Sequence, residues 1–309
     1  ALESDQRVEI AECAEKALQS GKLIFKSDSK NIAALTYNYG LSLVDLDKEK
    51  SLKILKTAVR LYEEIHGKDS PELVDVLFDA RLYHRALKIV ASAHGKTSVM
   101  YAQMALDASI LLVGNPSTTT SKLSQSNRFA RQAYDIFNKK FGPKAVGTTL
   151  ASFQLGKNKM AAGKNRSSIP FFEIALNNSS VGQYAHGFLI VVYEKLGQSD
   201  LATFHAQELG KLLPGRESHD YVPVFVKRPK YPIGAQRAGK EGYVIVEVTI
   251  SKKGLAIDPV IVEANPPTYG FSKAAIQASQ GLRFVPQFTD GEAVEVPGIL
   301  YKYTFQMAR

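Results

Sequence analysis

The sequence predicts an α-helical repeat solenoid followed by a small α/β (α+β) domain with an antiparallel sheet and one packed helix. Two observations lead to this fold class. Up to about Pro214, apolar residues recur at intervals of three and four, which is the period of an amphipathic helix. From about Tyr221 they recur at intervals of two, which is the period of a half-buried strand. We therefore expect two domains, residues 1–217 and 218–309, divided in a short polar segment near Ser218.

The helical domain contains an internal repeat. The segment that begins at Leu155 aligns with the segment that begins at Leu189, at an offset of 34 residues. The aligned positions that suit a close approach of two helices are Gly163 with Gly197, Ser168 with Ala202, and Phe172 with Ala206. A fixed period of this kind predicts stacked helical hairpins. The alignment places Phe172 in the core of one of them.

An earlier unit, residues 31–73, has the same plan in a longer form. Gly40 lies in its first helix, a polar turn follows at residues 45–48, and the second helix runs to about Ile65. The segment 66–71 ends that helix and caps the next one. These units resemble tetratricopeptide repeats (TPR), the first the longer variant and the last two the 34-residue variant. Residues 71–142 fit the period poorly, and the tryptophan of the repeat consensus is absent.

The C-terminal domain opens with an extended segment. Pro229 and Pro232 fix their own φ and push the preceding residues out of the α region, so no helix runs through residues 229–232. After a short helical turn at 233–238, we expect a hairpin of strands 243–250 and 255–263 with a turn at 252–254. Residues 271–282 have the spacing of a helix that packs on the sheet, and alternation returns in a closing strand, 299–307.

These elements carry a recognisable set of residues. The order is P-x-Y-P, then A-x-x-x-G-x-E-G before a strand, a turn glycine, a helix with paired alanines, R-F-x-P, a D-G turn and an aromatic closing strand. The residues are Pro229, Tyr231, Pro232, Ala235, Gly239, Glu241, Gly242, Gly254, Phe271, Ala274, Ala275, Arg283, Phe284, Pro286, Asp290 and Gly291. Taken as a whole, the pattern resembles the TonB C-terminal domain over roughly residues 221–309.

The resemblance implies a periplasmic protein in the cell envelope of a Gram-negative bacterium. It implies a sheet that recognises an extended segment of an outer-membrane transporter or another envelope protein, with contacts from Arg228, Pro229, Tyr231 and Pro232. Arg228 stands where transporter-coupling members of the family commonly have Gln. Tyr231 has two interpretations, an anchor under the short helix or a direct ligand contact. An alternative function is a structural adaptor that binds proteins or cell-wall polymer through the solenoid, without energy transduction.

The closing strand is the expected docking element. It follows a helix and not a hairpin turn, so it should lie at an outer position with one row of backbone groups free to accept an added strand. The expected partner-binding residues are Gly298, Ile299, Leu300, Tyr301, Lys302, Tyr303, Thr304 and Phe305. Tyr301, Tyr303 and Phe305 should form the buried face. Two other covers for the edge stay open: the β-rich segment 221–226, or a second copy of the domain in a homo-oligomer.

Composition narrows the class of protein. A hydrophobic fraction of 45% and a charged fraction of 22% are typical of a globular protein. The net charge of +9 is spread over both domains, without the arginine-rich run or zinc-finger spacing of a nucleic-acid-binding protein. A single cysteine, Cys13, excludes an internal disulfide. No run approaches the ~18 apolar residues of a membrane span. The chain begins at Ala1, so we expect that a signal peptide or an anchor has been removed, or that the protein is soluble by nature.

The sequence holds no recognised catalytic motif. The G-x-S-x-G elbow, the G-x-G-x-x-G loop and HExxH are all absent. His205 and Glu208 share a helical face, which is half of a metal site, but a surface pair is the simpler interpretation. We therefore expect a binding protein without enzymatic activity, cofactor or metal.

Overall fold

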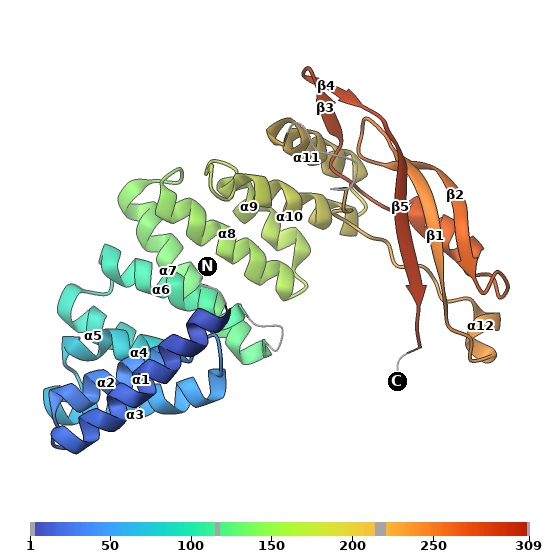
Figure 1. Cartoon of the computed structure of the whole chain (residues 1–309). Helices are drawn as coiled ribbons and strands as arrows, with labels where there is room; N and C mark the ends of the chain where they lie inside the picture. Colours follow the sequence, from blue (N-terminus) through green and yellow to red (C-terminus); the bar gives the residue numbers. More distant parts are fainter. Residues whose placement is uncertain (1–3, 115–117, 214–220, 308–309) are drawn as a thin grey trace. The chain divides into compact units, whose positions relative to one another are not determined.

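The computed structural model describes residues 4–114, 118–213 and 221–307. In this part of the chain, helices run from residue 4 to residue 212, and the sheet begins at residue 242 (Figure 1). The chain divides into two compact units, residues 1–151 and 152–309. The domain boundary predicted between residues 217 and 218 falls inside the second unit, within the segment 214–220 that lies outside the described residues. It stays a prediction about where the helical repeats end.

The first unit is made of helices that pack against their sequence neighbours. The helices are α1 (Ser4–Ile24), α2 (Lys30–Ser42), α3 (Lys48–His66), the 3-10 helix η1 (Pro71–Leu73), α4 (Val74–Asp79), α5 (Tyr83–His94), α6 (Val99–Val113) and α7 (Thr120–Phe141). The most extensive contacts join α2 to α3 and α6 to α7. Small residues allow this close packing: Ala105 and Ala133 are fully buried in one cluster beside Phe129. Residues 71–142 therefore also form helical hairpins, although their sequence fits the repeat period poorly.

Two of the connections in the first unit share a sequence. His66–Ser70 reads HGKDS and His94–Ser98 reads HGKTS. In each, the N–H of the glycine donates to the carbonyl of the residue four positions earlier, which closes the preceding helix. The two glycines have nearly identical φ, 85° at Gly67 and 86° at Gly95. In the second, the Ser98 hydroxyl accepts from the Tyr101 N–H at 3.1 Å and caps α6. This duplication, which was not among the sequence predictions, supports the assignment of a repeat.

The 34-residue repeat is confirmed in the second unit. Helix α8 (Val146–Ala161) spans the division between the units, and α9 (Asn165–Ala175), α10 (Gly182–Lys195) and α11 (Ser199–Leu212) follow. Helices α9 and α11 begin 34 residues apart, and the preceding turns hold Gly163 and Gly197 with φ of 72° and 70°. Phe172 of α9 is fully buried, as the alignment predicts.

A small antiparallel sheet with one covering helix completes the second unit. Its elements are α12 (Ile233–Arg237), β1 (Gly242–Ile250), β2 (Ala256–Asn265), α13 (Phe271–Ser279), β3 (Gln287–Thr289), β4 (Glu292–Val294) and β5 (Val296–Phe305). The strand order is β2-β1-β5, and β3 and β4 form a separate hairpin. Alternate residues of β1 are buried with Phe271, Ala275 and Ala278 of α13. The predicted fold class is therefore confirmed, and the short β3–β4 hairpin around the D-G turn is an additional element that was not predicted.

In the described part of the chain, none of the helices combines the length and the apolar character that crossing a bilayer requires.

Candidate functional site

The sheet presents β5 as one of its two outer strands. β1 lies in the centre and pairs antiparallel with β2 on one side and with β5 on the other. This order follows from the connections: β1 and β2 form a hairpin, whereas α13 lies between β2 and the strands that end the chain. Among the described residues, no further strand pairs with the outer side of β5. Its outer backbone groups are therefore free to bond another strand.

Side chains of β5 alternate between the core and solvent. Tyr303 and Phe305 are buried against α13 and β1, and Tyr301 is half-buried beside Tyr303, as predicted. Leu300, Lys302 and Thr304 are exposed on the opposite face. The ammonium group of Lys302 lies 3.9 Å from the centre of the Tyr243 ring on the neighbouring strand. The Lys302 side chain is thus held by a contact within the sheet.

The pairing of β5 with β1 is regular over seven residues. Positions from Ile299 to Phe305 face β1 residues from Val248 back to Gly242 without a register shift. Below Ile299 the register changes, and Gly298 adopts φ of 77°, which forms a bulge next to Pro297. Gly298, one of the predicted partner-binding residues, therefore lies in the bulge, and the regular edge consists of residues 299–305.

The other outer strand, β2, is less suited to accept a partner. Its pairing with β1 has two register shifts, and Asp258 has a positive φ of 50°. Pro259 lies within the same irregular stretch and has no N–H to donate. Natural sheets use bulges and prolines of this kind to block unwanted strand addition. Of the two outer strands, β5 therefore has the more regular edge.

The P-x-Y-P segment lies under the end of β5. The Tyr231 ring packs edge-on against Phe271 and Phe305, with ring centres 6.0 and 5.9 Å apart. The Tyr231 hydroxyl donates to the Lys240 carbonyl at 2.7 Å. Of the two interpretations of Tyr231, the structure thus provides contacts for the anchor. Arg228 is exposed, and Pro229 and Pro232 are partly buried beside it, so a ligand contact from Arg228 stays a prediction.

The segment 221–226, considered as a cover for the edge, pairs elsewhere. The Phe225 N–H and the Val224 N–H both donate to the Arg283 carbonyl, at 3.2 and 2.7 Å, and the Arg283 N–H donates to the Phe225 carbonyl at 3.0 Å. The Tyr221 hydroxyl donates to the Gln287 side chain at 2.7 Å. This segment is therefore held beside the loop that follows α13, and it leaves β5 open.

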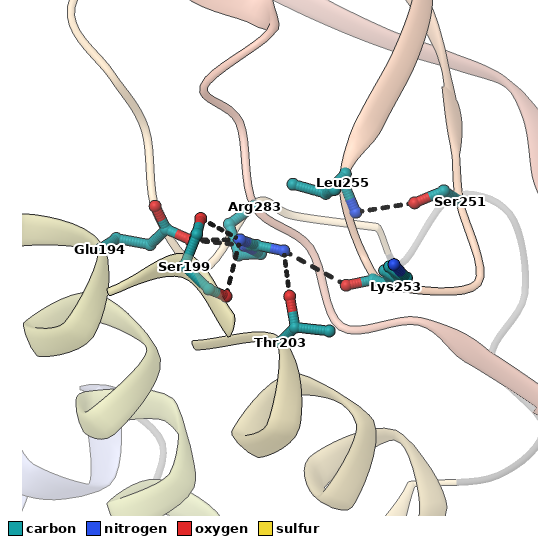
Figure 2. A network of polar contacts seen from close by, with 7 residues as sticks. All are labelled: Glu194, Ser199, Thr203, Ser251, Lys253, Leu255 and Arg283. Atoms are coloured by element: carbon teal, nitrogen blue, oxygen red, sulfur yellow. Dashed lines mark hydrogen bonds and ion pairs between the residues drawn. The ribbon is translucent and has the colours of Figure 1, made fainter. Parts of the chain in front are cut away.

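Arg283, a residue of the R-F-x-P motif, is buried between α10, α11 and the β1–β2 turn (Figure 2). Its side chain is 1% exposed and forms an ion pair with Glu194. Nε lies 2.8 Å from Glu194 Oε1, Nη2 donates to the Ser199 hydroxyl at 2.8 Å, and Nη1 donates to Thr203 at 3.0 Å and to the Lys253 carbonyl at 3.3 Å. The guanidinium thus joins the last helical hairpin to the sheet.

His205 is buried in the last helical hairpin, so the interpretation of His205 and Glu208 as a surface pair is wrong. Its Nδ1 lies 3.0 Å from Nδ1 of His186, and its ring stacks on Tyr193 with centres 5.5 Å apart. Burial first, and the neighbouring His186 second, lower the pKa of His205 to about 4. The carboxylate of Glu208 pairs instead with Lys211 at 2.6 Å. No group of three or more His, Cys, Asp or Glu residues with metal-site geometry occurs in the described ranges.

Residues 227–307 match the model of the family described as the C-terminal domain of Gram-negative bacterial TonB proteins. The resemblance recognised in the sequence is therefore confirmed for this part of the chain. A comparison with curated proteins found no relative.

Several solved structures are similar to the chain. BtubC (BKLC) from P. vanneervenii is 13% identical, with a TM-score of 0.46, over 68% of this chain and 96% of that chain. A putative kinesin light chain from Podosopora anserina with nearly identical TPR-like repeats is 11% identical, with a TM-score of 0.38, over 66% and 86%. A thermophilic TPR protein of Thermus thermophilus is 14% identical, with a TM-score of 0.32, over 58% and 90%.

Proposed function

We propose that this chain is a protein-binding scaffold of the Gram-negative envelope, in which the outer edge of β5 accepts an extended segment of a partner. The regular, uncovered edge of residues 299–305 carries the proposal. Seven residues in unbroken register offer a row of backbone donors and acceptors to an added strand. The match to the TonB C-terminal family supports a partner in the envelope.

The exposed face next to this edge suits a partner with few sequence requirements. Leu300, Lys302 and Thr304 combine one apolar, one cationic and one hydroxyl side chain. Affinity in strand addition comes mainly from main-chain hydrogen bonds, and pockets for alternate side chains provide specificity. We therefore expect the partner to be recognised chiefly as an extended backbone. No catalytic step is part of this proposal, which is for a binding protein without enzymatic activity.

The test uses proline substitutions on both sides of the strand. Neighbouring residues of an antiparallel edge strand point their N–H groups to opposite sides, so Leu300 and Tyr301 differ in which strand they can bond. Proline at the outward position removes a donor to the partner, and proline at the inward position breaks the ladder to β1. Leu300→Pro and Tyr301→Pro are both made in the full chain. Circular dichroism identifies the variant that stays folded.

Binding is measured by fluorescence anisotropy with labelled synthetic peptides that copy periplasm-facing segments of outer-membrane transporters. We expect the folded proline variant to lose binding by more than about tenfold. Lys302→Ala keeps its backbone donor and should change affinity by less than about twofold, since an exposed charge contributes little. If the folded proline variant and wild type bind equally well, the docking edge is not β5. The chain could instead dimerise as its concentration rises, with the same proline substitution abolishing the dimer. In that case the strand that adds to β5 belongs to a second copy of the chain and not to a partner peptide.

A further inference from the structure

The positive charge of the helical domain lies in one short region. Residues 83–144 carry nine Lys and Arg against two Asp and Glu, a net charge of +7. This region comprises α5, α6 and α7 of the first unit. Neither the edge of β5 nor any motif of the C-terminal sheet uses these residues. A basic surface of this density attracts anionic partners.

A hollow of about 520 Å³ lies among these helices. Its polar lining includes Lys88 and Lys96 from α5 and the following turn, Arg128 and Gln132 from α7, and His84. The apolar stems beneath them come from Leu87, Ala91 and Phe129. A volume of this size is within the usual range for ligand pockets and could hold the side chains of a few peptide residues.

Arg128 is held in place by His84 and Phe129, and within the described ranges it pairs with no carboxylate. Its Nη2 lies 2.7 Å from Nε2 of His84, and its guanidinium carbon lies 5.6 Å from the centre of the Phe129 ring. Because a guanidinium can only donate, Nε2 of His84 accepts this hydrogen bond. Burial, and secondly the charge of Arg128, lower the pKa of His84. The side chain of Arg128 is exposed at the hollow. Its remaining donors form a fork that matches a planar carboxylate.

Two other groups extend this donor set. The Tyr101 hydroxyl donates to Oε1 of Gln132 at 3.2 Å, which leaves the amide NH₂ of Gln132 as a donor in the lining. The Nζ of Lys88 lies 3.9 Å from Asp69 in a pair whose two side chains are largely exposed. Such a pair is weak, so an incoming carboxylate can replace Asp69 at little cost.

We propose that this hollow binds an acidic segment of a protein partner, with Arg128 receiving a carboxylate. Three of the nine cations, Lys88, Lys96 and Arg128, line this one hollow, whose volume suits a few residues of a peptide better than a long polyanion. The aromatic rings of the lining, Tyr101 and Phe129, are 8% and 2% exposed, so they offer no open face on which nucleic-acid bases could stack. This site is distinct from the edge of β5 and provides the scaffold with a second contact.

The experiment uses a fluorescein-labelled peptide of about eight residues rich in Asp and Glu, within the capacity of a pocket of this size, and a copy with Asn and Gln at the same positions. Binding to the full chain is measured by anisotropy at low and moderate salt. The test variant is Arg128→Gln with Lys88→Gln. The control is Lys139→Gln with Lys140→Gln, which removes the same charge from exposed positions of α7 outside the hollow.

We expect the acidic peptide to bind and the amide copy not to bind. The test variant should weaken binding by about tenfold or more, because it removes two charged donors, and hydrogen bonds to ionised groups are about twice as strong as neutral ones. The control should lose less than about threefold. Equal loss in both variants, or equal binding of both peptides, would overturn the proposal. Tighter binding of a single-stranded oligonucleotide or of free citrate, with the same dependence on Arg128, would also overturn it in favour of another ligand class.

Discussion

Arg283 illustrates how one side chain can define a junction. A buried cation is stable only when it is paired and its donors are satisfied. Glu194, Ser199 and Thr203 provide these partners from the helical hairpin, and the Lys253 carbonyl provides one from the β1–β2 turn. The ion pair of Arg283 with Glu194 therefore joins the last helical hairpin to the sheet.

Replacing Arg283 by Met should destabilise the second unit by about 3–5 kcal/mol, the usual cost of leaving one member of a buried pair alone. Replacing Glu194 by Leu in the same protein removes the uncompensated charge, and the double variant should recover at least half of the loss. Chemical unfolding of the full chain, followed by circular dichroism, measures both. A double variant as unstable as Arg283→Met would show that the other hydrogen bonds, and not the ion pair, stabilise the junction.

His205 makes the second unit sensitive to acid. It is 5% exposed and is packed by His186 and Tyr193 of α10, with Glu208 on its own helix as the nearby carboxylate. Its pKa is about 4 in the folded protein and 6.5 in the unfolded chain. Between these values the unfolded state binds more protons, so the free energy of unfolding falls as pH is lowered through this window. Glu208 opposes this effect, because its charge raises the pKa of His205.

The variant His205→Gln should have a flatter dependence of Tm on pH. From pH 7 to pH 5 we expect the wild-type Tm of the second unit to fall by about 4–8 °C more than that of the variant. The roughly 1.5 pH units below the unfolded-state pKa correspond to about 2 kcal/mol, and 1 kcal/mol corresponds to about 2–4 °C in a unit of this size. Differential scanning calorimetry at the two values of pH provides the measurement. His94→Gln, an exposed position of the first unit, is the control. If Tm falls equally with pH in the wild type and in His205→Gln, His205 is not held in its neutral form in the folded protein.

At the scale of elements, helix packing in the second unit depends on Phe172. Its ring is fully buried, stacks on Phe188 with centres 5.1 Å apart, and meets Phe153 edge-on at 6.0 Å. A Cβ atom on Gly156 would lie 2.7 Å from the Phe172 ring. The glycine thus allows α8 to approach α9 closely, as expected for a repeat hairpin.

Phe172→Ala should therefore lower the free energy of unfolding by about 3–5 kcal/mol. Phe204→Ala, at an exposed phenylalanine of the same unit, should cost less than about 1 kcal/mol. Urea titration of both variants distinguishes the two sites. A loss below about 0.5 kcal/mol at Phe172 would contradict the assignment of this residue to the core of the helical hairpin.

At the scale of the molecule, packing between the last helices and the sheet decides which parts of the chain unfold together. The same apolar cluster contains Phe172 of the repeat and Val285 of the loop after α13. Gly210 of α11 approaches the Pro286 carbonyl so closely that a Cβ there would lie 2.6 Å away. The sheet and the last helices thus share packing as well as the Arg283 ion pair.

Expression of two fragments tests whether the sheet depends on the last helices for its stability. Residues 146–309 keep all the contacts of Arg283 and Val285, and residues 221–309 lose their helical partners. We expect the longer fragment to melt cooperatively. The shorter fragment should be less stable by at least about 3 kcal/mol, because Arg283 loses its partner Glu194 there. Thermal melts by circular dichroism compare them. Equal melting temperatures would show that the sheet domain folds independently, with its boundary near residue 218.

Periodicity alone determined much of this protein from its sequence. The change of apolar spacing from three and four to two separated helices from strands, and the 34-residue offset placed Phe172 in a core. Alternation in residues 299–307 assigned Tyr303 and Phe305 to the buried face. The order of the elements predicted β5 at an outer position. These signals are local, because they depend on the geometry of one helix or one strand.

Only the tertiary structure decided which distant residues meet. Glu194 and Arg283 lie 89 residues apart, and no local pattern marks them as a pair. The bulge at Gly298, the irregular pairing of β2 and the open edge of β5 depend on register between strands, which each strand alone does not specify. The basic hollow exists because α5 and α7 bring Lys88 and Arg128 together. Contacts of this kind follow from the packing of elements and not from their periods.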